Sequence, residues 1–369
     1  MNFLPESLQG TARRWAVPFA LLLLTLVLVP LLRMLPVDSA LHPSDYTLTW
    51  LGKIMCYMLA ALALDMAWGV TGILSLGHGL YFALGGYMMG MHLMREIGRD
   101  GVYKSDLPDF MVFLDWKEMP WFWTGSEHFW VTLLQIVLVP GIVAFVFGFF
   151  AFRSRIKGVY LSIITQALTY AALLLFFRNE TGFGGNNGFT DFKRILGVPL
   201  AQPGTRTFLF ALTGFVLVLS LLLCGWILRS RYGRILTAVR DAESRLLFCG
   251  YDTLWFKLSV WTFSAVLCGI AGALYVPQVG IINPSEMSVG SSIEMAVWVA
   301  VGGRGSLVGA LLGAGLVNGA KSWFTAVFPD IWLYFLGALF ILTTLFLPQG
   351  ILGLYASLRR KLSKSGGAA

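Results

Sequence analysis

Long apolar runs recur along almost the whole chain, and they constrain the fold more than any other feature. A helix that crosses about 30 Å of hydrocarbon needs about 20 mostly apolar residues. Hydrophobic residues make up 57% of the 369 and charged residues only 12%, so a soluble fold would lack polar surface. We therefore expect an all-α membrane protein, a single domain over 1–369 with about ten transmembrane helices. The expected spans are 15–35, 50–70, 74–94, 129–150, 157–177, 207–228, 256–277, 290–303, 305–326 and 331–349.

The distribution of positive charge predicts the orientation of the chain. Arg13 and Arg14 precede the first apolar run, as in a signal peptide, but the run is long and no small-x-small cleavage site follows it closely. We therefore expect a first transmembrane helix. With both termini in the cytoplasm, most of the 27 Lys and Arg residues fall on the cytoplasmic side, as the positive-inside rule requires. The net charge of +8 then describes a membrane surface and does not indicate a nucleic-acid partner.

Motifs for bound cofactors and for catalysis are absent from the sequence. Cys56, Cys224, Cys249 and Cys268 have no CxxC or other ligand spacing, so we expect them to pack without a metal or a disulfide. There is no GxxxxGK(S/T) motif that would cradle ATP, and no HExxH, GxSxG or paired-carboxylate arrangement. We expect a non-catalytic protein that binds no cofactor itself.

A Gly-rich segment, residues 72–79, opens the third expected span. Small residues let backbones approach closely, or let a helix break where protein or a water-filled path covers it. Ser75 and His78 in this segment are candidates for a substrate path, although a lone His on an apolar helix can equally be a packing residue. Asp65 lies inside the preceding span, where ionisable groups are costly. Because Asp65 is near the cytoplasmic end of that span, a solvated or helix-pairing role and a transport role both stay open.

A second Gly-rich segment, residues 302–306, opens a later span in the same way and hints at an internal repeat. Gly305, Gly309 and Gly313 follow each other at intervals of four. On a helix this spacing places them on one face, where small residues allow two helices to pack closely. We expect a helix-contact seam at these glycines.

Two segments are expected on the outer side, 95–128 and 178–206. The first is rich in aromatic residues, Trp121 and Trp123 among them, which predicts an interfacial aromatic belt, with a partner-binding surface as the alternative. The second carries Asn186 and Asn187 within a Gly-rich run. This run is either a plain tight turn or a lid over a substrate entrance.

The basic segment 229–256 is the most informative part of the sequence. Its apolar residues are spaced to form one face of a short helix over about 234–249; they are Ile235, Ala238, Val239, Ala242 and Leu246. Its polar residues are Arg234, Arg240, Asp241, Glu243 and Arg245. Asp241 and Arg245 are spaced for a favourable i,i+4 pair. A helix that lies on anionic lipid favours Lys and Arg without acids, so the mixed charges favour a groove in a partner protein.

Three separated motifs resemble the permeases of branched-chain amino acid ABC importers. They occupy residues 68–79, 238–243 and 302–305, in the same order as in that family. The resemblance covers about residues 50–355. Within the family, the sequence is most similar to the longer permease of urea-transport systems. The tracts that carry this narrower match are 121–123, 176–188 and 275–284.

The resemblance implies one subunit of a heteromeric importer in a bacterial inner membrane. Its partners would be a second, related permease, two ATPase subunits that hold ATP and Mg, and a periplasmic substrate-binding protein, all arranged about the lipid bilayer. Segment 229–256 would form the coupling helix that inserts into a groove of the ATPase, with Arg240, Asp241 and Glu243 matching the family's Arg-Asp-x-Glu stretch. Urea is the expected substrate, moved by alternating access along Ser, Asn, Gln and backbone carbonyls. Asn283, in the third urea-type tract, joins the candidate path residues on this basis.

Other functions stay open at this stage. A branched-chain amino acid permease would need an apolar pocket and a cation for the α-carboxylate, and Arg304 is the basic residue at a hinge. A stand-alone channel or ion-coupled transporter would use Asp65 and His78 as proton carriers. A structural membrane scaffold would need neither Arg240 nor Glu243.

Overall fold

The computed structural model describes residues 26–36, 39, 41–346 and 350–354. Most of these residues are helical, and five of the helices are long and apolar enough to cross a membrane. These five are Asp45–Val70, which joins α2 (Asp45–Asp65) to the π-helical turn η1 (Met66–Val70), and α5 (Phe129–Arg153), α6 (Val159–Phe177), α7 (Pro203–Arg229) and α9 (Thr253–Val279). The predicted all-α polytopic membrane protein is therefore confirmed.

The remaining helices leave the count of about ten crossings a prediction. α10 (Val289–Gly302) and α11 (Leu307–Val327) are bent by 118° at their junction and together count as at most one further span. With 14 residues, α10 rises roughly 21 Å, which is short of the hydrocarbon thickness. α12 (Trp332–Phe346) covers most of the expected span 331–349, of which 347–349 lie outside the described residues. Of the expected span 15–35, residues 26–32 are helical and 15–25 lie outside the described part.

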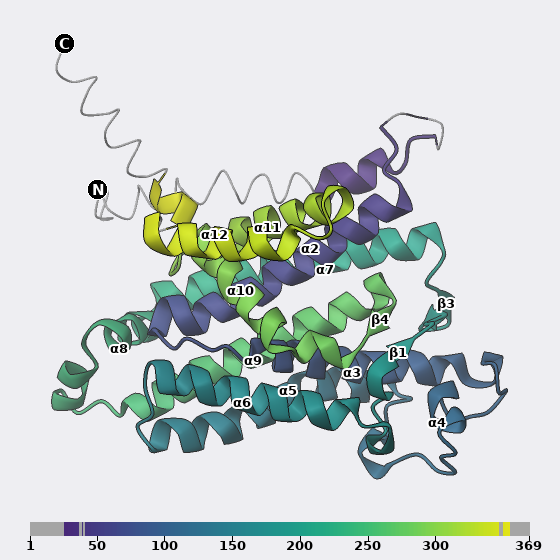
Figure 1. Cartoon of the computed structure of the whole chain (residues 1–369), viewed down its shortest axis with the longest axis horizontal. Coiled ribbons are helices and arrows are strands. Elements are labelled where there is room, and N and C mark those ends of the chain that lie inside the picture. The colour runs from purple at the N-terminus through teal and green to yellow at the C-terminus, as the bar shows by residue number, and fades with distance from the viewer. Residues whose placement is uncertain (1–25, 37–38, 40, 347–349, 355–369) are drawn as a thin grey trace.

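α9 lies at the centre of the bundle and contacts α2, α3 (His78–Ile97) and α5. α11 and α7 pack on the other face of α2, so that α3, α5 and α6 lie on one side of α9 and α2, α7, α11 and α12 on the other (Figure 1). Glycines allow the central contact: a Cβ on Gly85 would lie 1.9 Å from the Gly269 carbonyl oxygen, and one on Gly272 would lie 1.8 Å from the Phe82 carbonyl oxygen. The backbones of α3 and α9 thus touch directly.

α3 begins later than the sequence predicts. The expected span was 74–94, but helical structure starts at His78. The reason is local: α2 ends in the π-helical turn η1, and Gly72 has φ +77°, a conformation that ends helical propagation. Residues 72–77 therefore form a non-helical connection between α2 and α3, as the Gly-rich composition permits.

The two ends of the bundle differ in structure. α8 (Arg231–Phe248) projects from one end, and the segments between α3 and α5 and between α6 and α7 cover the other (Figure 1). Short elements build this second end: η2 (Gly98–Asp100), α4 (Asp109–Phe113), η3 (Trp121–Trp123), η4 (Asn179–Thr181), η5 (Gly185–Asn187), β1 (Phe189–Thr190), β2 (Arg194–Ile195), β3 (Val198–Pro199), β4 (Ile281–Ile282) and η6 (Pro284–Met287). β1 pairs antiparallel with β4, and β2 with β3. The register places Phe189 opposite Ile282.

The aromatic residues of segment 95–128 do not all form the expected belt. Trp123 is fully buried, and its Nε1–H donates to the carbonyl oxygen of Gly182 at 3.0 Å. Phe122 stacks on Phe183, with ring centroids 5.5 Å apart. Trp121, in contrast, is 85% exposed. The belt prediction is therefore wrong for Trp123, because segments 95–128 and 178–206 pack on each other through these rings.

Candidate coupling site and transport path

α8 forms where the basic segment predicts a helix, but its boundaries and continuity differ. Ser230 caps the helix, since its Oγ accepts a hydrogen bond from the Gly233 N–H at 3.2 Å. Ala242 has φ −153° and ψ 53°, which breaks the helix into two pieces. The expected Asp241–Arg245 pair is therefore wrong: the break removes the i,i+4 register, and Asp241 pairs with Arg240 instead.

One face of α8 packs on the bundle and its end projects away. Gly233, Leu236 and Val239 are buried, whereas the expected apolar face omitted Leu236. Arg234 and Arg245 are exposed. At the end of the helix, Phe248 is 92% exposed, although it is a large apolar side chain. Leu247 and Tyr251, close to it in the sequence, are 53% and 43% exposed, so large apolar side chains gather at this end of α8. Exposed apolar patches of this kind mark contacts with other proteins or with the membrane.

Arg240 joins α8 to the end of α2. Its Nη1 donates to the carbonyl oxygen of Gly69 at 2.7 Å, and its Nε donates to Asp241 Oδ1 at 2.7 Å. This hydrogen bond from Arg240 lowers the pKa of Asp241 below its usual value. The stem of Arg240 passes so close to Gly72 that a Cβ there would lie 3.1 Å from Arg240 Cγ. Two of the sequence motifs, 68–79 and 238–243, therefore meet at Arg240.

The third motif meets the same point through Asp65. Asp65 is fully buried, and its Oδ1 accepts from the N–H of Gly305 at 2.8 Å. Gly69 lies between them: a Cβ on Gly69 would lie 2.0 Å from Asp65 Oδ1 and 2.4 Å from the Gly305 nitrogen. Arg304 adds a cation–π contact, with its Cζ 5.5 Å from the Trp68 ring centroid. We call the contacts of Asp65, Gly69, Arg240 and Gly305 the hinge junction.

Glu243 points into the chain and links three segments. Its carboxylate accepts from Lys157 at 2.8 Å, from Thr253 at 3.0 Å and from Lys257. Burial raises the pKa of Glu243, but the hydrogen bonds from the two lysines outweigh burial and hold the pKa below its usual value of 4.5. Beside this carboxylate lies a cavity of about 350 Å³, enclosed by residues 71–74, the start of α6 and α8.

The second Gly-rich segment forms a contact within the chain. Gly305 has φ +78° and lies in the turn before α11, contrary to the expected seam of three helical glycines. A Cβ on Gly313 would lie 2.0 Å from the Trp298 carbonyl oxygen, and one on Gly309 would lie 2.8 Å from that of Gly303. Gly309 and Gly313 therefore let α11 fold back closely on α10.

Ser75 and His78 lie inside the protein. Ser75 is fully buried, and its Oγ accepts from the Gly77 N–H at 3.2 Å. His78 is also fully buried, and its Nε2 lies 2.7 Å from Ser264 Oγ, whose hydroxyl donates to the Ala63 carbonyl oxygen. Tyr81 and Trp261 contact the imidazole edge to face. His78 thus ties α3 to α9 and α2, while its Nδ1 has no hydrogen-bond partner among the described residues.

The three candidate asparagines lie at the opposite end from α8. Asn186 and Asn187 are exposed in η5. Asn283 Oδ1 caps η6 by accepting from the Ser285 N–H at 3.1 Å. Gly188 brings two of the urea-type tracts together, since a Cβ there would lie 2.1 Å from the Ile282 carbonyl oxygen. Neither Ser75 nor His78 is joined to these residues by any contact among the described residues.

Among charged residues within the expected spans, the sequence pattern was used to predict a functional role for Asp65 alone. Three others were missed. Lys53, Glu294 and Lys321 lie inside the expected spans 50–70, 290–303 and 305–326, and they come together in the structure. Their position within those spans is the signal that could have found them, because ionisable groups inside spans are functional candidates by default.

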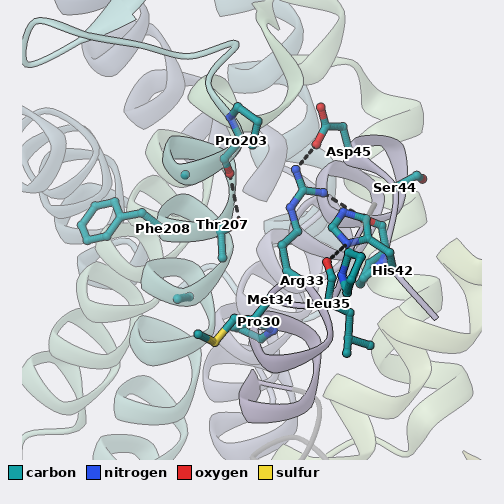
Figure 2. A pocket seen from close by; sticks show the side chains of 14 residues that line it. Pro30, Arg33, Met34, Leu35, His42, Ser44, Asp45, Pro203, Thr207 and Phe208 are labelled. Carbon is teal, nitrogen blue, oxygen red and sulfur yellow. Dashed lines mark hydrogen bonds and ion pairs between the residues drawn. The ribbon is translucent and has the colours of Figure 1, made fainter. Parts of the chain in front are cut away.

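A cavity of about 810 Å³ opens beside the start of α2 and α7 (Figure 2). Arg33 points at Asp45 there and forms an ion pair with it, and Asp45 also accepts from Arg206 at 3.1 Å. Arg33 Nη1 donates to the Pro43 carbonyl oxygen at 2.8 Å. The charged groups at this cavity pair with one another. This arrangement fits a contact that holds residues 26–36 against α2 better than a binding site for a solute.

The bundle and its hinge junction define a class: a polytopic membrane protein whose projecting helix is hydrogen-bonded to the break at the end of one span. Residues 46–344 match the family model described as branched-chain amino acid transport system / permease component. This chain belongs to that family.

Relatives support the same assignment. The chain is similar to the high-affinity branched-chain amino acid transport system permease protein LivM of Salmonella typhimurium, with 26% identity over 320 residues that cover 81% of this chain and 68% of that protein. LivM of Escherichia coli is 25% identical over 337 residues, which cover 85% and 71%. BraD of Pseudomonas aeruginosa is 26% identical over 304 residues, which cover 80% and 91%. No solved structure matches the chain significantly. The expected urea specificity receives no support from these names.

Proposed function

We propose that this chain is a permease subunit of an ABC importer for branched-chain amino acids. Membership of the family and the printed names of its relatives support this substrate class. As partners we propose a second permease, two ATPase subunits that hold ATP and Mg, and an external binding protein. The chain itself is a non-catalytic membrane subunit with α8 at the cytoplasmic side.

The observation that carries the coupling mechanism is the bond from Arg240 to the Gly69 carbonyl oxygen. Phe248 and the exposed arginines of α8 contact the ATPase. When nucleotide binding closes the ATPase subunits, α8 moves, and Arg240 carries the displacement into η1. Asp65 and the Gly305 turn follow, because Gly69 leaves no space between them. The bend between α10 and α11 then changes, and with it the access to the path.

Docking is tested with Phe248→Asp in the full complex. A carboxylate at this tip cannot enter an apolar groove without a large desolvation cost, so we expect the ATPase subunits to be lost on purification. Val102→Asp is the control, since Val102 is 83% exposed at the opposite end of the bundle. If Phe248→Asp keeps the ATPase bound and active, α8 does not dock through its tip. The lipid alternative for α8 predicts that ATPase docking and activity stay unchanged in Phe248→Asp.

Urea is the second candidate substrate, because the tracts that resemble urea permeases contact one another: Gly188 lies against Ile282, and Trp123 is hydrogen-bonded to Gly182. The reconstituted complex with its binding protein separates the two. Leucine uptake and leucine-stimulated ATP hydrolysis support the proposal. A response to urea without a response to leucine would overturn the substrate and leave the coupling mechanism intact. Flux through this chain alone, driven by a pH gradient and indifferent to ATP, would replace the importer with an ion-coupled transporter.

A further inference from the structure

Six charged or aromatic side chains gather within the helices, far from the hinge junction. We call them the Lys53 cluster; they are Lys53 and Tyr57 of α2, Tyr275 of α9, Glu286 of η6, Glu294 of α10 and Lys321 of α11. Lys53 lies roughly 12 Å along α2 from Asp45, at 1.5 Å per residue. Lys53 is thus in the half of α2 that lies away from α8, within a helix of membrane length.

The charges of the cluster are unequally satisfied. Lys321 Nζ lies 2.8 Å from both carboxylate oxygens of Glu294, which forms a closed ion pair. Glu286 Oε1 accepts from the Tyr275 hydroxyl at 3.2 Å. Lys53 interacts electrostatically with Glu286 and Glu294, but no carboxylate oxygen of the described residues lies within 4.0 Å of its Nζ. An ammonium held at depth without a direct anionic partner carries a desolvation cost that a bound carboxylate would offset.

Aromatic rings lie next to Lys53. Its Nζ lies 5.8 Å from the Tyr57 ring centroid and 6.0 Å from that of Tyr275. Tyr57 and Tyr275 are 5.6 Å apart, and Trp298 and Phe82 continue the wall at 5.0 and 6.1 Å from Tyr57. A cation, an acid with one oxygen free of hydrogen bonds to described residues, and an apolar wall therefore lie side by side.

Lys53, Tyr57 and Glu286 are half-buried, and the Lys321 side chain is 39% exposed. The cluster is thus reachable from outside this chain and not sealed in its core. His78, by comparison, is fully buried. The Lys53 cluster has the accessibility that a transport path needs.

We propose that the Lys53 cluster forms one wall of a binding site for zwitterionic α-amino acids on the transport path. Lys53 binds the carboxylate, Glu286 binds the ammonium group, and the rings of Tyr57 and Tyr275 contact the apolar side chain. The second permease closes the site. This inference rests on the proposed amino acid import. A neutral amide such as urea would gain neither ion pair.

The test uses the complete complex, reconstituted with its ATPase, second permease and binding protein, and measures leucine transported per ATP hydrolysed. Lys53→Met should lower this ratio about tenfold or more, as expected from the loss of a charge-assisted hydrogen bond. Lys53→Arg should retain most of it, and Glu286→Gln should lower it. Complex assembly should stay unchanged in each. Lys117→Met, at an exposed position of the outer segment, is the matched control.

The outcomes separate the two levels of the argument. If the wild-type complex transports leucine and Lys53→Met does so equally well, the site is refuted and the proposed function stands. If the wild-type complex transports urea and no amino acid, both the substrate and the zwitterion site are refuted. If Lys53→Met does not assemble, Lys53→Gln against Lys53→Arg decides, because both keep a long polar side chain and differ in charge; equal leucine transport by these two refutes the site.

Discussion

Gly69→Ala tests the hinge junction at its most crowded point. The added Cβ would lie 2.0 Å from Asp65 Oδ1 and 2.4 Å from the Gly305 nitrogen, the two atoms of one hydrogen bond. The methyl group must therefore push the end of α2 away from the turn before α11. Overpacking of this kind costs about 1–3 kcal/mol, and loss of a hydrogen bond to a charged acceptor costs about 1.5–3 kcal/mol. Ala gains about 0.5–1 kcal/mol over Gly in helical backbone. The expected net loss is about 2–5 kcal/mol.

The measurement is unfolding of the purified chain in mixed detergent micelles, followed by Trp fluorescence, together with substrate-stimulated ATP hydrolysis by the complex. We expect lower stability and a loss of stimulation, because the path from α8 to the α10–α11 bend runs through this contact. Gly319→Ala is the matched control, since Gly319 lies in α11 with nothing within 4 Å of an added Cβ. If Gly69→Ala is as stable and as active as Gly319→Ala, the junction is not the close contact described above.

Two further predictions concern carboxylates. Asp65→Asn should change stability by less than about 1 kcal/mol, because an amide oxygen can still accept from Gly305, whereas Asp65→Leu leaves that N–H unpaired and should cost about 1–3 kcal/mol; equal losses in micelle unfolding would contradict this. Glu243→Gln should cost about 1–2 kcal/mol, since Lys157 is largely exposed and its share is screened. The folded pKa of Glu243 is below 4.5, so its stabilisation is full above that pH and is lost as pH falls through the folded pKa. Stability measured from pH 7 to pH 3 should therefore fall at the acid end more steeply in the wild type than in Glu243→Gln; parallel curves would refute the role of the two lysines.

The sequence was sufficient for the fold class and for most helices. Membrane-length apolar runs place α5, α6, α7 and α9 within a few residues of their expected bounds, because a span is a local property of composition. The same holds for a helix in the basic segment, where period and capping are also local. What the sequence could not place was the start of α3 and the break at Ala242, since each depends on the backbone angles of a single residue, Gly72 or Ala242, which residue type alone does not determine.

The functional features of the protein show the same contrast between local pattern and tertiary packing. The sequence by itself determined the membrane class, the three Gly- and Arg-containing motifs and the family resemblance, because each is carried by residue types at fixed spacing. Only the tertiary structure decided that Arg240, Gly69, Asp65 and Gly305 meet at one point, and that His78 is fully buried beside Ser264. It also brought Lys53 and Glu286, from segments more than two hundred residues apart, into contact with the same side chain, Tyr275. Proximity between distant segments arises from helix packing, and no local pattern in the sequence records it.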